Sequence, residues 1–487
     1  MYSNITPLQI KKNFLFFLII AIFIFCLYAP ALFHAPRADH WDYLLDMQHC
    51  QTCSDTLLHS YSYNRTRTIA PGDTLLFRPL LFTYLALIDC TIRNHFMLIQ
   101  SFGILLQLAV CWLFYKLLID FGDFFTNFPK NRLPFFAFLA TLIFASSPLI
   151  VEQVSWNHIQ GYMISTLIGL MICRFLLNYL HTETLPLKKG IIGWLLCTTA
   201  CFFYEANILF AWMLSFIFFT TKNPLPYKKS IALGFFLIPF IYFSVDYYDY
   251  ITHQATFMPD LTSTRLIHKF TFSDTFYNAF RFLKYTFAFP LIAIQPHYGI
   301  APRLEIPEAS LSMLSATGLI TTGVLVFTVL LLFFTIRQQK TKKQSNSTLF
   351  ILFLLGWLSA YTFINVLGRM NGNTAASALA ASPYYAYVPS LIACLLFSIV
   401  GFQRYPTQYT FSKVSLIFFA ILFFLFITVR GATVFRINQK QAKAQKNLIA
   451  LLQDIHTHPN QLITNERLYA AGVAHDIPKI KILLKTV

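Results

Sequence analysis

Charged side chains are scarce in this chain: Asp, Glu, Lys and Arg make up 12% of its 487 residues, against 56% for the apolar types. A soluble protein of this length would bury its apolar runs in two or three cores, and so few charges could not coat them. Apolar runs of about 18 residues or more instead recur along the whole length, as in helices that cross a membrane. The composition therefore excludes a soluble enzyme and predicts an all-α polytopic membrane protein.

Acidic residues are the rarer charge, with 20 Asp and Glu against 37 Lys and Arg and a net charge of +17. A basic excess of this size raises the question of a nucleic-acid partner. Most of the Lys and Arg residues, however, stand in short clusters between apolar runs, which is the positive-inside pattern of membrane proteins. The charge therefore indicates topology, and we expect the lipid bilayer rather than nucleic acid as a partner.

A small-residue cleavage site is missing near the N-terminus, where Lys11 and Lys12 precede an apolar run as they would in a secretory signal. We therefore expect this run to be retained as a first span that leaves the cytoplasm. The alternation of apolar runs and basic clusters then predicts about eleven transmembrane helices. The expected spans are roughly 14–33, 96–118, 134–151, 159–179, two short helices within 191–220, 231–248, 312–336, 348–366, 384–402 and 414–432.

This topology divides the chain into a transmembrane domain, residues 1–436, and a short soluble tail, residues 437–487, outside the cytoplasm. The two large outer loops cover about 34–94 and 249–310, and they are the first and fourth loops on that face. Each contains an apolar segment that is short or interrupted by charge, so we expect an interfacial helix in each.

The nine cysteines are scattered, and most lie in expected spans, where they behave as small apolar residues. Cys50 and Cys53 differ, because they form a C-x-x-C in the first outer loop. We interpret them as two loop thiols or a local disulfide. A zinc site would need two further ligands, and only His49 and His59 are nearby.

Ionisable residues gather outside the expected spans in the first third of the chain. Asp39, Asp42 and Asp46 follow the first span, and Arg78 and Glu152 stand where later segments reach the same face. Taken singly, the aspartates can serve solvation, and Arg78 can snorkel toward lipid headgroups. Glu152 can be a plain helix terminus, although a carboxylate at a C-terminus opposes the helix dipole. Together these residues predict a polar site on the outer face.

Five short motifs occur in an order that resembles the integral-membrane glycosyltransferases of the GT-C class. They are "RADHWDYLLD" (37–46), "FRPL" (77–80), "SSPLIVEQVSW" (146–156), "YEA" (204–206) and "SPYYAYVPS" (382–390). The chain is most similar to bacterial polyprenyl-phosphate-sugar transferases and to transmembrane O-mannosyltransferases, without the tetratricopeptide repeats of the latter. "NHFMLIQ" (94–100) also fits, and the likeness covers roughly 14–440. It implies a GT-C-like bundle and transfer of a sugar from a polyprenyl-phosphate donor to an extracytoplasmic lipid, glycan or protein.

The resemblance implies catalytic roles for the outer acids, with Asp39, Asp42 and Glu152 as the catalytic set. The acidic motif of the relatives is often two adjacent acids, so which aspartate is the base stays open here. A partly desolvated carboxylate suits this role, because its pKa rises toward the working pH. Some relatives also use a divalent metal (Mg²⁺ or Mn²⁺), for which Asp39 and Glu152 would furnish oxygen ligands, and others manage without one.

The donor phosphate needs cations, and Arg78 can grip it bidentately. Pro383 stands where the relatives carry an arginine, so Arg369, or Arg303 in the second large loop, would assist. The remaining donor-binding residues implied by the likeness are Glu205, Tyr384 and Tyr385. Glu205 interrupts a long apolar stretch, where an acid is costly and by default functional, and its plain alternative is a turn residue.

Two other functions fit a chain of this composition. One is an O-antigen ligase or polysaccharide polymerase, which relies on arginine and histidine in a late loop rather than on acids after the first span. The other is a lipid or solute transporter, which should carry ionisable residues at mid-depth in several spans, often in repeated halves. We expect a bacterial inner membrane, with the active site facing the periplasm, because the bacterial likeness is nearest and the chain has no endoplasmic-reticulum retrieval signal.

Overall fold

The structure of the chain is a computed structural model. It describes residues 7–34, 43, 47, 50–67, 78–92, 95–182, 186–221, 227–257, 272–288, 295–296, 304–305, 316–337, 342–369, 383–404 and 413–457.

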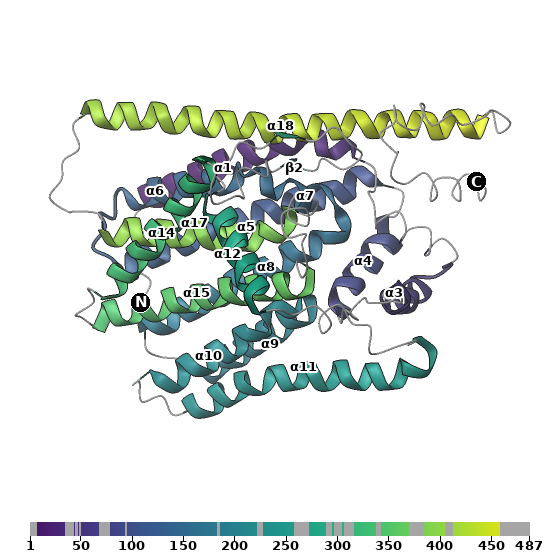
Figure 1. Ribbon diagram of the computed structural model, residues 1–487, viewed down its shortest axis with the longest axis horizontal. Helices are drawn as coiled ribbons and strands as arrows, with labels where there is room; N and C mark the ends of the chain where they lie inside the picture. The colour runs from purple at the N-terminus through teal and green to yellow at the C-terminus, as the bar shows by residue number, and fades with distance from the viewer. Residues whose placement is uncertain are drawn as a thin grey trace.

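The described residues form a bundle of helices, most of which run along the long axis of the molecule (Figure 1). Their only strands pair as a short antiparallel hairpin, β1 (Gln295–Pro296) with β2 (Leu304–Glu305). Six of the described helices are long and apolar enough to cross a membrane, and five shorter apolar helices accompany them. The predicted all-α polytopic membrane architecture is confirmed, while the count of eleven spans stays a prediction.

The elements before α9 are α1 (Pro7–Tyr28), η1 (Ala29–Phe33), α3 (Cys53–Arg67), α4 (Pro79–Ile92), α5 (Phe96–Phe125), α6 (Leu133–Ala145), η2 (Pro148–Ile150), α7 (Val151–Ser155), η3 (Asn157–Ile159) and α8 (Gln160–Thr182). The later elements are α9 (Leu187–Phe203), η4 (Glu205–Asn207), α10 (Ile208–Thr220), α11 (Lys228–Phe257), α12 (Phe272–Ala288), α14 (Ala316–Arg337), α15 (Lys342–Arg369), η7 (Pro383–Ala386), α17 (Tyr387–Arg404) and α18 (Lys413–Thr457).

Helix α5 is the centre of the bundle. It packs against α1, α6, α7, α8 and α17, and half of its residues are buried; apart from Gln100 and Gln107 these are aromatic, aliphatic or small. A Cβ at Gly103 would collide with the carbonyl oxygen of Val154 and with the side chain of Gln160. The absence of a side chain there therefore lets α5 approach α7 and α8 closely, which fixes the segment that carries Glu152.

The stretch 191–220 is divided as predicted. It forms α9 and α10, and the single-turn helix η4 between them begins at Glu205. Tyr204 is extended, with φ −157° and ψ 122°, and ends α9. The Asn207 side-chain amide then donates to the carbonyls of Ala200 and Tyr204 at 3.0 and 3.2 Å, so the last turn of α9 is capped by the residue directly before α10.

The third expected span, 134–151, ends earlier than predicted. Helix α6 stops at Ala145, and Ser147 is extended (φ −69°, ψ 123°) because the following Pro148 disfavours helical backbone before it. Glu152 then lies in the first turn of the separate helix α7. The alternative of a plain helix C-terminus at Glu152 is therefore wrong, and a carboxylate in a first turn is the arrangement that the helix dipole favours.

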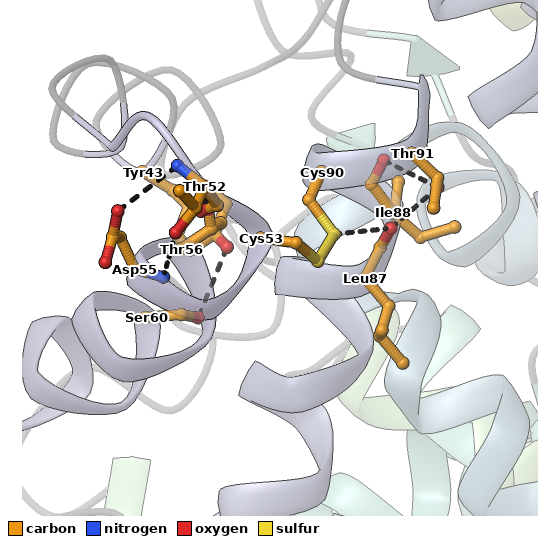
Figure 2. The surroundings of a disulfide bond; sticks show 10 residues. All are labelled: Tyr43, Thr52, Cys53, Asp55, Thr56, Ser60, Leu87, Ile88, Cys90 and Thr91. Atoms are coloured by element: carbon orange, nitrogen blue, oxygen red, sulfur yellow. Dashed lines mark hydrogen bonds between the residues drawn. A yellow bond between two sulfur atoms is a disulfide. The ribbon is translucent and has the colours of Figure 1, made fainter.

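A disulfide joins α3 to α4, between Cys53 and Cys90 (Figure 2). The alternative of a local bridge between Cys50 and Cys53 is therefore wrong, because the partner of Cys53 lies 37 residues further along the chain. Helix α3 begins at this cysteine with reciprocal capping bonds: Thr52 N donates to Asp55 Oδ2 at 3.2 Å, and Asp55 N donates to Thr52 Oγ1 at 3.1 Å.

Helix α18 lies along one side of the bundle and packs against α1 and η1 (Figure 1). Asn438 Nδ2 donates to the Leu27 carbonyl at 3.1 Å, and the Asn438 carbonyl lies 2.9 Å from His34 Nε2. The predicted soluble tail begins within this helix, which continues without a break to Thr457, and residues 458–487 lie outside the described part.

Candidate functional site

Arg78 stands directly before α4, at the helix start that the "FRPL" motif encodes. Its carbonyl accepts hydrogen bonds from the amides of Leu81 and Phe82 at 3.1 and 3.3 Å. Pro79 occupies the first helical position, where its missing N–H is not needed. The helix is also tied to α3, because Ser60 Oγ donates to the Phe82 carbonyl at 3.1 Å. The motif therefore fixes the backbone from which the arginine projects.

The guanidinium of Arg78 lies among aromatic rings rather than at a lipid-facing surface. Arg78 is 7% exposed, and its Nη1 donates to Tyr162 Oη at 2.9 Å. Its Cζ lies 4.6 Å from the ring centre of Tyr204 and 5.5 Å from that of Tyr162. A desolvated cation over two tyrosines gains about 2 kcal/mol or more per contact. The snorkelling alternative does not describe this side chain.

Tyr204 links this arginine to α15. Its hydroxyl donates to Asn365 Oδ1 at 3.1 Å, and Asn365 Nδ2 donates to the Tyr361 carbonyl at 2.8 Å. Arg369 is the last residue of α15, one turn beyond Asn365. The structure thus connects the start of α4, the end of α9 and the last turns of α15.

The first turn of α8 connects the same region to α7. Tyr84 of α4 donates to Gln160 Oε1 at 2.8 Å, and Gln160 Nε2 donates to the Val154 carbonyl at 3.2 Å. Gly161 allows α4 to lie close, because a Cβ there would collide with the Leu81 side chain. Glu152 is 3% exposed on α7, so it is a carboxylate held inside the protein rather than in solvent.

The "SPYYAYVPS" segment lies against α7, the helix that carries Glu152. Its 3₁₀ helix η7 packs on η2 and on α7, and Tyr385 within it is buried at 8% exposure. The structure therefore brings the segment after residue 382 next to the one that carries Glu152, although 230 residues separate them in the sequence. Two of the motifs that suggested the GT-C likeness are neighbours in space.

The remaining predicted residues are placed only in part. Asp39, Asp42 and Arg303 lie outside the described residues. Glu205 begins η4, Tyr384 lies in η7 and Arg369 ends α15. For these three residues the structure describes the backbone but not the side chain. Within the described residues, no three His, Cys, Asp or Glu side chains gather as metal ligands do. The predicted metal pair of Asp39 and Glu152 therefore stays a prediction.

Sequence reasoning missed the aromatic partners of Arg78. Tyr162 was not singled out, and Tyr204 was noted only as a neighbour of Glu205. The signal available was weak: a Gly-Tyr pair, Gly161-Tyr162, directly after a short polar segment that begins a long apolar helix. Nothing local to "FRPL" indicates which distant rings contact its arginine.

Comparisons with known proteins identify no family for this chain. No protein-family model matches it, and no curated protein matches its sequence. Among solved structures it is similar to the archaeal oligosaccharyltransferase AglB from Archaeoglobus fulgidus, in complex with an inhibitory peptide and a dolichol-phosphate, with a TM-score of 0.46 and 11% identity. The match covers 93% of this chain and 59% of that one, so the chain spans less than two thirds of the length of AglB. A similarity this low does not transfer a function.

Proposed function

We propose that this chain is a membrane glycosyltransferase that moves a sugar from a polyprenyl-phosphate donor to an acceptor outside the cytoplasm. The observation that carries the proposal is the buried guanidinium of Arg78, held by Tyr162 and stacked on Tyr204 at the start of α4. An arginine fixed in this way is pre-organised to bind a phosphate bidentately, and it cannot lose its charge.

The chemistry follows from where charge develops. As the bond between the anomeric carbon and the phosphate oxygen breaks, negative charge grows on the lipid phosphate, and a fixed guanidinium in a water-poor site stabilises that charge. The hydrogen bond that Arg78 Nη1 donates to Tyr162 and the ring of Tyr204 hold the guanidinium, so little reorganisation is needed during the reaction. Arg369, one turn beyond Asn365, would assist as a second cation.

A carboxylate must take the proton of the acceptor hydroxyl. Glu152 is one candidate, because it is a buried carboxylate on α7 next to η7, and carboxylates serve as general bases. Asp39 or Asp42, from the segment after η1, is the other source of the base. If a Mg²⁺ or Mn²⁺ ion takes part, Glu152 with Asp39 would hold it through carboxylate oxygens and it would supply charge at the phosphate.

The disulfide supports the proposed orientation. Disulfides form and persist in oxidising compartments such as the bacterial periplasm, and they are rare in the cytosol. The Cys53–Cys90 bond encloses Arg78 within its loop. We therefore propose that this loop faces the periplasm from a bacterial inner membrane.

The test is turnover of a donor by the purified chain in vesicles. A panel of polyprenyl-phosphate hexoses and pentoses is mixed with envelope extract as acceptor, and release of polyprenyl phosphate is measured. We expect turnover of at least one donor and a loss of about a hundredfold or more in Arg78→Gln and Arg78→Lys, since Lys cannot bind bidentately. The control is Arg132→Gln, which changes an exposed arginine before α6 and should retain activity.

Two results would contradict the proposal. Full turnover in both Arg78 variants would remove the arginine from the mechanism. Movement of a lipid or solute across the vesicle by wild-type protein, without consumption of any donor, would identify a transporter instead.

A further inference from the structure

A second buried arginine lies on the last helix, away from Arg78. Arg430 is in the middle of the apolar segment Ala420–Lys443, and it is 8% exposed. An arginine inside a membrane span is costly, and it is tolerated when it faces the protein interior or a polar cavity. Burial shows that the side chain does not extend along the lipid-facing surface to reach headgroups.

The contact between α18 and α1 turns Arg430 away from α1. A Cβ at Gly431 would lie 3.2 Å from Leu27 Cδ2, so this residue faces α1 at close range. Successive helical residues are about 100° apart around the axis, and Arg430 therefore points to another side. There its Cζ lies 5.1 Å from the ring centre of Phe426, one turn earlier on the same helix.

On that side, Arg430 lines a cavity of about 220 Å³ between α6, α12, α17 and α18. The walls are mostly hydrocarbon, from side chains such as Ala140, Phe397 and Phe426. An engineered cavity of roughly 150 Å³ accepts benzene, so this one has room for part of a lipid chain. Among the described lining residues, Arg430 is the one cation and none is acidic.

Two hydroxyl groups in this cavity point to a ligand. Ser147 and Ser390 are 3% and 5% exposed, and both line the cavity. Within the described part of the chain, neither hydroxyl has a hydrogen-bond partner. Buried hydroxyls are normally hydrogen-bonded, so an acceptor from a bound molecule would satisfy both. With Arg430 they offer donors from three separate elements to one anion.

The length of the cavity along α17 is close to the thickness of one leaflet of a bilayer. Ser390 and Ser398 both line it and are eight residues apart on α17, which corresponds to about 12 Å along the helix. The hydrocarbon of one leaflet is about 15 Å thick, half of a core of about 30 Å. Ser147 and Ser390 lie where η2 and η7 pack together, at the loop end of α6 and α17. The two hydroxyls without a partner are therefore at one end of the cavity, and the wall continues from there along α17 to Ser398.

We propose that this cavity binds one anionic phospholipid, with its phosphodiester on Arg430, Ser147 and Ser390 and part of an acyl chain along the apolar wall. A phosphodiester offers oxygens that accept hydrogen bonds from one guanidinium and two hydroxyls. A phosphate monoester, such as a polyprenyl phosphate, carries about −1.5 to −2 at pH 7 and would need more positive charge than the described lining residues supply. The lining differs from the surroundings of Arg78, because it comes from α6, α12, α17, α18 and the residue after α6, and not from α4, α8 or α9. The cavity borders the junction of η2 and η7, where the two motifs that contain Ser147 and Ser390 meet.

The test is native mass spectrometry of the full-length chain with phosphatidylglycerol, phosphatidylcholine or a polyprenyl phosphate added at equal concentration. We expect one phosphatidylglycerol to bind in preference to phosphatidylcholine, without competition from inorganic phosphate. Loss of a charge-assisted bond should weaken this binding about tenfold in Arg430→Gln. The matched control is Arg436→Gln, which changes an exposed arginine on the same helix and should bind within about twofold of wild type.

Equal binding of phosphatidylglycerol by wild type and Arg430→Gln would overturn the proposal, as would a preference for phosphatidylcholine. Binding of the polyprenyl phosphate in place of phosphatidylglycerol would also overturn it and would identify a second donor-lipid site. If Arg430→Gln does not fold, Ala393→Leu provides the test, because it keeps the arginine and fills the cavity. Unchanged phosphatidylglycerol binding in that folded variant would refute the site.

Discussion

The two tyrosines around Arg78 should contribute unequally to donor turnover. In Tyr162→Phe the ring remains, but the 2.9 Å hydrogen bond from Arg78 Nη1 is lost. Hydrogen bonds to charged groups contribute about 1.5–3 kcal/mol, and 1.36 kcal/mol corresponds to a factor of ten in rate. We therefore expect kcat/KM for the donor to fall about ten- to a hundredfold.

Tyr204→Phe keeps the ring 4.6 Å from the arginine and removes the neutral bond to Asn365. A neutral hydrogen bond contributes about 0.5–1.5 kcal/mol, so kcat/KM should fall about two- to tenfold. The assay is release of polyprenyl phosphate in vesicles, with Tyr227→Phe, an exposed tyrosine, as the control. A larger loss in Tyr204→Phe than in Tyr162→Phe, or full activity in the latter, would refute the assignment of the main arginine contact.

Two further predictions concern the framework around the site. Cys53→Ser should remove the covalent link between α3 and α4 and lower the stability of this region by about 4 kcal/mol on the loop-entropy model. The measurement is the rate of proteolysis within α3, which should rise. In the control Cys50→Ser the disulfide remains, so the electrophoretic shift on reduction should be the same as in wild type. Gly103→Ala should lower the thermal midpoint, because overpacking against the α7 backbone costs about 1–3 kcal/mol. In the control Gly323→Ala the new Cβ meets nothing within 4 Å, and Ala is the better helix former, so the midpoint should not fall.

The sequence was informative where a single local cause decides the structure. Glu205 between two apolar runs with basic flanks was enough to predict the turn between α9 and α10, because an acid is unfavourable in the middle of a span. Pro148 could have shown in the same way that α6 ends before Glu152, since a proline removes its predecessor from helical backbone. That signal was present in the motif, and its implication for the glutamate was missed.

Contacts between distant segments could not be predicted in this way. The partner of Cys53 is 37 residues away, and Tyr162 is 84 residues from Arg78. Only the packing of α4 on α3 and α8 brings these groups together, and a single sequence carries no measure of such packing. The cavity beside Arg430 depends on four helices at once, so the arginine looked like one more basic residue near the end of a span.

Helix α18 is longer than one crossing of a bilayer requires. Its 45 residues extend for about 68 Å, more than twice the roughly 30 Å of bilayer hydrocarbon. If the apolar first half crosses the lipid, the second half stands out from the surface as a straight rod with Lys440, Lys443 and Lys446 along it. Thr457 itself is then held tens of ångströms from the bilayer, on the side where η1 ends.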